Sequence, residues 1–190
     1  MKSSSGTGVE QVIEDSPNRR PTDWSRDGRY LFAETTSGGI WVHPQFGDKK
    51  PYSYLHSQFR EGEAKLSPDG KWLAYTSAES KQLEVYVVSF PTPDAKFQIS
   101  TKGGRIPVWS RDGRELYFIS GDSKMMAVNI NTVGGKFQAS VPQPLFDVRL
   151  GNNPNFDVSK DGRFLIPAVV NEPENEQMTV VLNWQAGLKK

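Results

Sequence analysis

The chain has 190 residues, which is enough for one domain with a hydrophobic core of its own. Its 23 basic and 22 acidic side chains are scattered along the sequence, so the charge indicates neither a nucleic-acid-binding nor a membrane-binding protein. The absence of cysteine excludes disulfides and cysteine-ligated zinc. The opening MKSSSGTG lacks the apolar core of a signal peptide, and no apolar run reaches transmembrane length.

The composition predicts an all-β protein. The 17 glycines and 13 prolines separate short apolar runs, and no long stretch has helical spacing. Residues 1–8 are expected to be a flexible lead-in, and residues 9–190 a single domain.

Four Asp-Gly pairs organise this domain. They are Asp27-Gly28, Asp69-Gly70, Asp112-Gly113 and Asp161-Gly162, at spacings of 42, 43 and 49 residues. The surrounding segments are DWSRDGRYLF, KLSPDGKWLA, VWSRDGRELY and DVSKDGRFLI. Each has Ser two residues before Asp, a basic residue after Gly, and Leu four residues after Asp. A period in the low forties with several short strands per period indicates a β-propeller of four-stranded antiparallel blades, about four in this chain.

The repeats predict blades at about 16–56, 57–100, 101–148 and 149–190. In each blade the Asp-Gly pair forms a hairpin between an inner strand and a second strand. The second strands YLFAE, WLAYTS, ELYFIS and FLIPA are apolar almost throughout, as expected for strands buried on both faces. Third strands are predicted at 39–44, 83–90, 124–130 and 178–184. Outer strands are predicted at 51–56, 96–100 and 144–148.

The first predicted strand, VEQVIED at 9–15, precedes the first hairpin as KFQIS precedes the third. It is therefore expected to be an outer strand, whereas the last unit has no outer strand of its own. Pairing of 9–15 with the last blade would close the ring and remove two open strand edges.

The repeated W-S-x-D-G-[RK]-x-L pattern resembles the TolB-like, WD-repeat-like propeller family of bacteria. PTDWSRDGRYLF, FREGEAKLSPDGKWLAYTS and TVVLNWQAGLKK are most similar to the C-terminal propeller regions of bacterial serine/threonine protein kinases. The resemblance implies an extracytoplasmic sensor or interaction module, attached to a cytoplasmic kinase through a membrane helix.

The sequence departs from this family in three ways. Only Pro68 keeps the proline of the family motif, and the fourth repeat has Val158 where an aromatic residue is usual. No kinase motif is present, so kinase activity is not implied. TolB-like propellers usually have six blades, which leaves three alternatives: a C-terminal fragment of a larger propeller, a four-bladed ring, or a half-propeller completed by self-association.

The hairpin aspartates are interpreted as turn-forming residues. Ser and Asp side chains can accept or donate hydrogen bonds within the turn, and Gly adopts the positive φ that a tight hairpin requires. A calcium loop would need oxygen ligands two and four residues away, where SRDGR and SKDGR have basic residues.

No constellation of catalytic residues is evident. The only histidines, His43 and His56, lie at predicted strand ends without metal-ligand spacing. Glu61 and Glu63 could be an acid/base pair or charges on the rim. No catalytic residue, metal or cofactor is therefore expected.

Arginines are the candidate binding residues. The loops that enter the inner strands carry Arg20, Arg60 and Arg105, with Arg149 further out in the last repeat. Inner strands surround the channel of a propeller, so these arginines should gather at one face. Guanidinium groups there could bind a carboxylate or an acidic peptide. Alternatively they form a solvated rim, paired with Asp15, Glu61 and Glu63.

The aromatic residues Trp24, Trp72 and Trp109 occupy repeat positions, which favours packing between blades over a ligand platform. The sequence thus predicts a non-enzymatic module that binds a protein or peptide, with self-association as a way to complete the ring and no nucleic-acid partner or membrane insertion. The alternative is the accessory propeller of a kinase or of a prolyl-oligopeptidase-like hydrolase. A lectin or lactonase-type propeller is disfavoured, because the inner strands present only Asp23 and Asp157.

Overall fold

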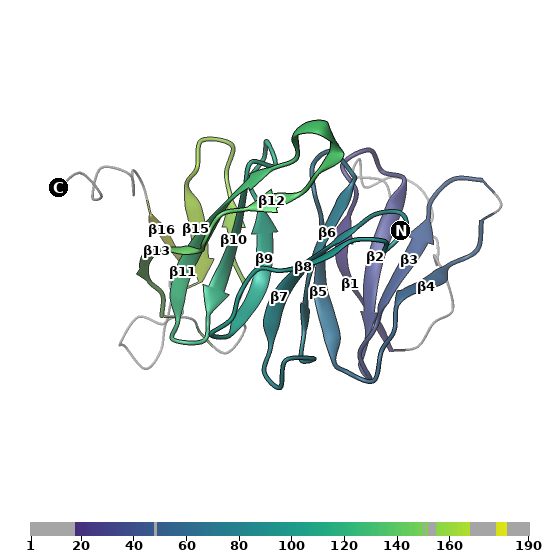
Figure 1. Ribbon diagram of the computed structural model, residues 1–190, viewed down its shortest axis with the longest axis horizontal. Helices are drawn as coiled ribbons and strands as arrows, with labels where there is room; N and C mark the ends of the chain where they lie inside the picture. The colour runs from purple at the N-terminus through teal and green to yellow at the C-terminus, as the bar shows by residue number, and fades with distance from the viewer. Residues whose placement is uncertain (1–17, 48, 150, 152–154, 168–177, 182–190) are drawn as a thin grey trace.

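The structure is a computed structural model that describes residues 18–47, 49–149, 151, 155–167 and 178–181 (Figure 1). Within these ranges every regular element is a β-strand, except for a 3₁₀ turn at Val133–Gly135. No helix of this part of the chain is long and apolar enough to cross a membrane. The lead-in predicted at 1–8 and the strand predicted at 9–15 lie outside the described residues.

The strands form four antiparallel sheets, and each contains one Asp-Gly hairpin. The first sheet contains β1 (Arg19–Trp24), β2 (Tyr30–Thr35), β3 (Ile40–Pro44) and β4 (Tyr52–Leu55). The second contains β5 (Glu61–Leu66), β6 (Trp72–Ser77), β7 (Glu84–Ser89) and β8 (Lys96–Gln98). The third contains β9 (Gly104–Trp109), β10 (Glu115–Ser120), β11 (Lys124–Asn131), β12 (Gln138–Ala139) and β13 (Gln143–Asp147). The fourth contains β14 (Asp157–Val158), β15 (Phe164–Pro167) and β16 (Met178–Val181).

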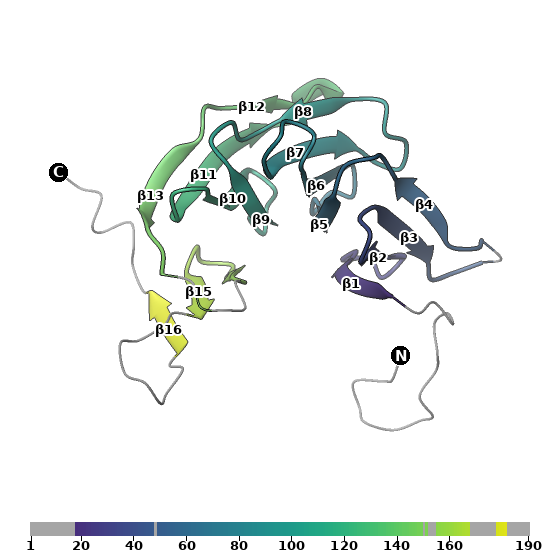
Figure 2. The same ribbon diagram turned by 90° about the horizontal axis from the view of Figure 1, so that it is seen from below.

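The sheets stand side by side in an open arc. Figure 2 shows the inner strands β1, β5 and β9 on the concave side of the arc, and β4, β8 and β12 on its convex side. The predicted all-β architecture of radially arranged four-stranded blades is confirmed. In the third blade the outer strand differs from the single strand predicted at 144–148, because β12 and β13 pair with opposite ends of β11.

The repeated hairpins are held by the residues that make the motif recognisable. In each of them the Ser hydroxyl donates to the Asp carboxylate, in the pairs Ser25–Asp27 (2.7 Å), Ser67–Asp69 (2.6 Å), Ser110–Asp112 (2.8 Å) and Ser159–Asp161 (2.5 Å). The glycine that follows has φ values of 74°, 72°, 74° and 77°, a region in which an L side chain is strained. The interpretation of these aspartates as turn-forming residues is confirmed.

The hydrophobic core consists of three layers, one between each pair of neighbouring sheets. Phe32 and Val42 of the first sheet pack with Leu73 and Tyr75 of the second. The second layer lies between the second and third sheets, and it contains Trp72 of the second sheet with Trp109 and Phe118 of the third. A third layer joins Tyr117 and Met125 of the third sheet to Phe164 and Ile166 of the fourth.

In the fourth hairpin, the strand pairing is shifted by one residue relative to the other three hairpins. In the third blade Trp109 pairs with Leu116, four residues after the Asp, whereas Val158 pairs with Phe164, three residues after Asp161. A slip of one residue turns every side chain of a strand to the other face. Phe164 is therefore buried, and Leu165, the repeat's leucine, is 40% exposed. The prediction that FLIPA is buried on both faces is wrong, because its residues alternate between buried and exposed.

Candidate functional site

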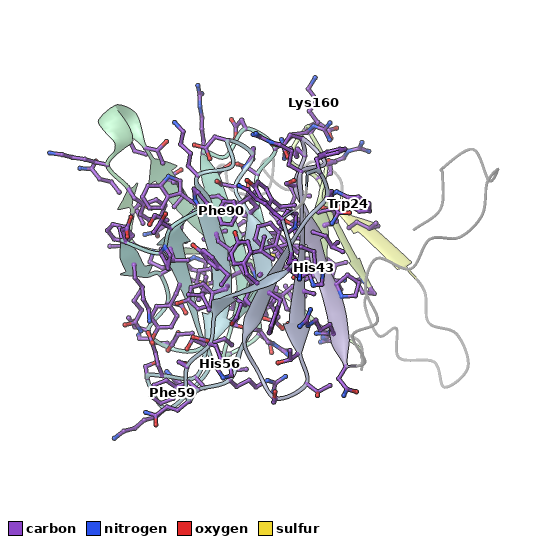
Figure 3. All side chains as sticks on the ribbon, turned by 90° about the vertical axis from the view of Figure 1, so that its right-hand side faces the viewer. Trp24, His43, His56, Phe59, Phe90 and Lys160 are labelled. Atoms are coloured by element: carbon purple, nitrogen blue, oxygen red, sulfur yellow. The ribbon has the colours of Figure 1, made fainter. Side chains whose placement is uncertain are left out.

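The predicted arginines lie near the strand ends that are opposite the hairpins. Arg20 belongs to β1, Arg60 directly precedes β5, Arg105 belongs to β9, and Arg149 follows β13. Figure 3 shows the two rims: Trp24 and Lys160 at hairpins lie on one, and His56 and Phe59 lie on the other.

A groove of about 340 Å³ lies between the first and second sheets. Its lining includes Arg20, Glu34, Gly38, Arg60, Gly62 and Glu63. The structure therefore brings Arg20 and Arg60 to one groove. Arg105 and Arg149 are described by the structure but do not line it.

Arg20 is fixed by Glu34, which lies opposite it on the neighbouring strand. The Arg20 Nε and Nη2 atoms both donate to Oε1 of Glu34, and the Nε distance is 3.0 Å. The other carboxylate oxygen, Oε2, accepts the backbone N–H of Glu63 at 2.7 Å. A Cβ on Gly62 would lie 2.5 Å from Oε2, so the glycine leaves the room that this carboxylate occupies. Glu34 is not evident from the sequence as the partner of Arg20; the available sign is Gly62, which stands at the repeat position that Arg20 and Arg105 occupy in their own blades.

Glu63 repeats the same connection one blade further on. Its Oε2 accepts the backbone N–H of Ile106 at 2.7 Å. Glu63 and Ile106 have φ values of 55° and 57°, and each lies at an irregularity in the pairing of its inner strand. A carboxylate of β2 (Glu34) and one of β5 (Glu63) thus each join their blade to the inner strand of the next blade, by accepting the N–H of a residue in left-handed conformation.

The Glu61 and Glu63 carboxylates have separate hydrogen-bond donors. Glu61 is buried and accepts from the Ser57 hydroxyl at 3.0 Å and from the Ser57 backbone N–H at 3.2 Å. Since Glu63 binds Ile106, both side chains have a structural role that accounts for their position. His56 is exposed and His43 is buried on β3.

The remaining predicted arginines make no ion pair within the described part of the chain. Arg60 and Arg149 are exposed and Arg105 is half-buried. The pairing of Arg60 and Arg105 with Glu61 and Glu63, expected for a solvated rim, is not among the ion pairs there, and Asp15 lies outside the described residues. With respect to the residues that the structure describes, the donors of the Arg60 guanidinium are therefore free, and they lie beside a groove.

A second cavity, of about 260 Å³, is lined by residues of the inner strands, among them Thr22, Lys65 and Ile106. Lys65 Nζ donates to the Thr22 carbonyl at 2.6 Å and lies 3.9 Å from the Asp23 carboxylate. Asp23 accepts the Leu66 N–H at 2.8 Å, and burial raises the pKa of Asp23 above its usual value. Lys65 and the nearby Asp23 thus join β1 to β5, while Arg20 and Glu63, which also line this cavity, bind Glu34 and Ile106.

The hairpin carboxylates have the properties of turn residues. Hydrogen bonds from the Arg29 backbone N–H and the Ser25 hydroxyl lower the pKa of Asp27 to about 2. Within the ranges that the structure describes, no group of three His, Asp or Glu residues could hold a metal ion. Asp157 bonds the N–H of its neighbour Val158 at 2.7 Å.

The tryptophans differ in their surroundings. Trp72 and Trp109 are both 7% exposed and lie in the core layer between the second and third sheets. Trp24 is 44% exposed, so the packing role predicted for it is not visible in this chain. Trp41 is half-buried, with the Arg19 guanidinium 3.5 Å from its ring centre.

Comparison with solved structures identifies the architecture. TolB from Acinetobacter baumannii superposes with a TM-score of 0.67 at 17% identity, over 88% of this chain and 42% of that one. The fold is that of a β-propeller. A Mycobacterium tuberculosis puromycin-hydrolysing peptidase matches with a TM-score of 0.57 at 18% identity, over 86% of this chain and 31% of that one. The Cps50 (Swd1) β-propeller domain of Myceliophteria thermophila matches with a TM-score of 0.53 at 10% identity, over 80% of this chain and 55% of that one.

At these identities the likeness concerns the fold alone, and this chain spans less than half the length of TolB. No family model matches the chain, and no curated protein matches it in sequence.

Proposed function

We propose that this chain is a non-enzymatic propeller module that binds a carboxylate-bearing protein segment or peptide through the groove between its first two blades. The observation that carries the proposal is Arg60. This guanidinium is exposed, lines the groove, and has no ion pair among the described residues. A carboxylate is its natural partner, because the planar guanidinium can donate two parallel hydrogen bonds to it.

The hydrogen-bond donors and acceptors that line the groove favour a ligand that accepts hydrogen bonds. Three carboxylates line it together with two guanidiniums, so its net charge alone does not attract an anion. However, the carboxylate oxygens of Glu34, Glu61 and Glu63 already accept bonds from side chains or backbone. The donors of Arg60 are left for a ligand, whereas no lining carboxylate is without a hydrogen-bond donor. This favours binding over acid/base chemistry in the groove.

The test is a titration of the 190-residue chain with fluorescein-labelled acidic peptides, followed by fluorescence anisotropy. Arg60→Gln should weaken binding at least about tenfold, since a charge-assisted hydrogen bond contributes about 1.5–3 kcal/mol and about 1.4 kcal/mol is a factor of ten. Arg114→Gln is the matched control, because Arg114 lies at the hairpin rim with an 84% exposed side chain. Equal affinities of wild type and Arg60→Gln would rule out the groove as the binding site.

A second candidate function is an accessory propeller attached to a catalytic domain. The peptidase among the structural neighbours favours it, because this chain matches less than a third of that protein's length. The resemblance of the repeats to kinase-associated propellers points to the same class of arrangement. Sequencing the gene on both sides of the segment that encodes this chain distinguishes the candidates. A hydrolase or kinase motif in the same reading frame would favour the accessory role.

A further inference from the structure

The hairpin rim, which consists of the connections between strands at the Asp-Gly end of the blades, carries an excess of basic side chains. These connections are 25–29, 45–51, 67–71, 90–95, 110–114, 132–137 and 159–163. The outer ones adjoin the hairpins, since the N–H groups of Gln45 and Phe90 donate to the carbonyls of Arg29 and Lys71, each at 2.8 Å. The described residues of these connections include ten basic side chains, all exposed, and five acidic ones, whereas the rest of the described chain has ten of each. The basic residues are scattered along the sequence, and only the fold gathers them on one face.

The hairpin turns do not require these charges. Three of the four hairpins have a basic residue between Ser and Asp, namely Arg26, Arg111 and Lys160, whereas the second has Pro68. The second hairpin nevertheless closes with the same hydrogen bond from Ser to Asp, at 2.6 Å, and with the same glycine conformation, at a φ of 72°. Figure 3 shows Lys160 at the outer edge of this rim. Turn formation therefore does not account for the three basic side chains.

Most of the basic residues of the hairpin rim are not neutralised by its aspartates. Within the described part of the chain, the ion pairs of this rim join Arg29, Arg114 and Arg163 to the aspartates of their own hairpins. The other seven basic residues of the rim form no ion pair there. Arg26 instead donates from Nη1 to the Arg111 carbonyl at 2.5 Å, which brings the tips of the first and third hairpins together. The rim thus presents a cluster of positive charge from several blades.

One exposed apolar side chain lies among these charges. Phe46 is 69% exposed, whereas the other aromatic residues of the rim connections, Phe90 and Phe137, are buried. Phe46 stands next to the residue that is bonded to Arg29, and shortly before the exposed Lys49. Phenylalanine beside basic side chains is a combination with which proteins bind the boundary between lipid headgroups and acyl chains.

We propose that the hairpin rim docks peripherally on a bilayer surface that contains anionic phospholipids. Each basic side chain near such a surface strengthens binding about fivefold, and the attraction falls off within a Debye length of about 8 Å at physiological salt. The single exposed Phe46 fits a membrane better than single-stranded nucleic acid, because proteins that bind single strands offer successive aromatic side chains for stacking. The inference does not rest on the peptide groove, since Arg20 and Arg60 lie near the opposite strand ends.

The first experiment measures sedimentation of the 190-residue chain with phosphatidylcholine vesicles that contain or lack phosphatidylglycerol, at about 0.1 M salt. Wild type should bind only the vesicles that contain phosphatidylglycerol. Loss of three charges in Arg26→Gln/Arg111→Gln/Lys160→Gln should weaken this binding about a hundredfold. No wild-type binding, or equal binding to the two kinds of vesicle, would overturn the proposal.

The matched control is Lys81→Gln/Lys102→Gln/Arg149→Gln, which removes the same charge from exposed residues near the opposite strand ends. These residues face away from the bilayer in the proposed orientation, so the control should bind vesicles as wild type does. Equal weakening in the two triple variants would show that only the net charge of the chain matters, and would overturn docking through the hairpin rim.

The second experiment reports whether Phe46 meets lipid. Because the chain has no cysteine, Phe46→Cys introduces one thiol, which is labelled with a fluorophore whose emission shifts to the blue in an apolar environment. Vesicles with phosphatidylglycerol should produce this shift, whereas duplex DNA and polyglutamate should not. A label at Val141→Cys is the control, since Val141 is 75% exposed outside the rim connections. An unshifted Phe46→Cys label on vesicle-bound protein, or an equal shift with duplex DNA or polyglutamate, would contradict docking on a membrane.

Discussion

The carboxylate of Glu63 accepts the backbone N–H of Ile106 at 2.7 Å, across the boundary between the second and third blades. The two residues are 43 positions apart, which is the length of one repeat. Glu34 bonds the N–H of Glu63 in the same way at 2.7 Å. Carboxylates therefore hold the inner strands β5 and β9 to the preceding blades, and Arg20 binds the first of these carboxylates, Glu34, at the groove.

Loss of the Glu63 carboxylate should destabilise the contact between blades. Ile106 is buried, so its N–H would be left without its hydrogen-bond partner in Glu63→Ala. A buried donor left unsatisfied costs about 1–3 kcal/mol, and we expect a loss of this size in urea unfolding. Glu63→Gln retains an acceptor oxygen and should lose less. Equal stability of Glu63→Ala and wild type would contradict the role assigned to this bond.

The hairpin glycines allow a comparison of backbone strain with crowding. Gly28 and Gly113 both have φ of 74°, so Val at either position is strained. A Cβ at Gly113 would in addition lie 3.2 Å from Cδ of Pro68, whereas nothing lies within 4 Å of one at Gly28. Gly113→Val should therefore cost at least about 1 kcal/mol, and more than Gly28→Val. Thermal unfolding of both variants checks this, and an unchanged melting temperature for Gly113→Val would contradict the hairpin assignment.

Glu84 should hold the loop at residues 100–104 in place through hydrogen bonds; this loop leads to Arg105. Its carboxylate is fully buried and accepts from the Ser100 hydroxyl, from Gln82 Nε2 at 2.5 Å and from the Gly103 N–H at 2.9 Å. Glu84→Ala removes an acceptor from these donors, and we expect destabilisation of about 2–3 kcal/mol with faster hydrogen exchange at 100–104.

Glu79→Ala is the control for Glu84, because the Glu79 carboxylate pairs with Lys96 at the surface. A surface ion pair contributes at most about 1 kcal/mol, so this change should leave the loop's exchange unaltered. Equal effects of the two substitutions on residues 100–104 would show that Glu84 does not hold the loop.

Acid should destabilise the fold through turn carboxylates, namely Asp27 of the first Asp-Gly hairpin and Asp122 of the turn between β10 and β11. Hydrogen bonds from neighbouring groups lower the pKa values of Asp27 and Asp122 to about 2, below the ordinary value of 3.8. The unfolded chain therefore binds more protons between these values, and stability falls as the pH drops through this window. Burial raises the pKa of Asp23, which acts in the opposite direction.

The double variant Asp27→Asn/Asp122→Asn should have a melting temperature that depends less on pH between about 4 and about 2. Both carboxylates are largely exposed, so the difference will be small. An identical pH dependence of the variant and wild type would show that these carboxylates do not contribute to acid sensitivity.

The local parts of the fold were predictable because their causes lie within a few residues. The Ser-x-Asp-Gly hairpins and the apolar second strands are encoded in contiguous segments, and β2, β6 and β10 lie at the predicted places. The slip in the fourth hairpin was not predictable from the aligned repeat. Its motif matches the others, and the register is set by the packing of Phe164 against Tyr117 and Phe146 of the third blade.

The candidate site was predictable only in part, for a related reason. The arginines could be placed at the entry to the inner strands from the repeat, but their partners are remote in sequence. Glu34 reaches Arg20 through strand pairing and Glu63 through the contact between blades. Only the three-dimensional arrangement therefore shows that Arg20 is paired with Glu34, while Arg60 has no ion pair among the described residues.

Binding of an acidic peptide by Arg60 is tested most directly by recording the arginine side-chain NMR signals while the peptide is titrated into the protein. The Nε–Hε signals are assigned by single Arg→Gln substitutions at Arg60 and Arg114 in protein labelled with ¹⁵N-arginine. Binding in the groove predicts that the Arg60 signal shifts and saturates with the peptide, while that of Arg114 at the opposite rim stays in place. Saturable binding that leaves the Arg60 signal unmoved would contradict the proposed function.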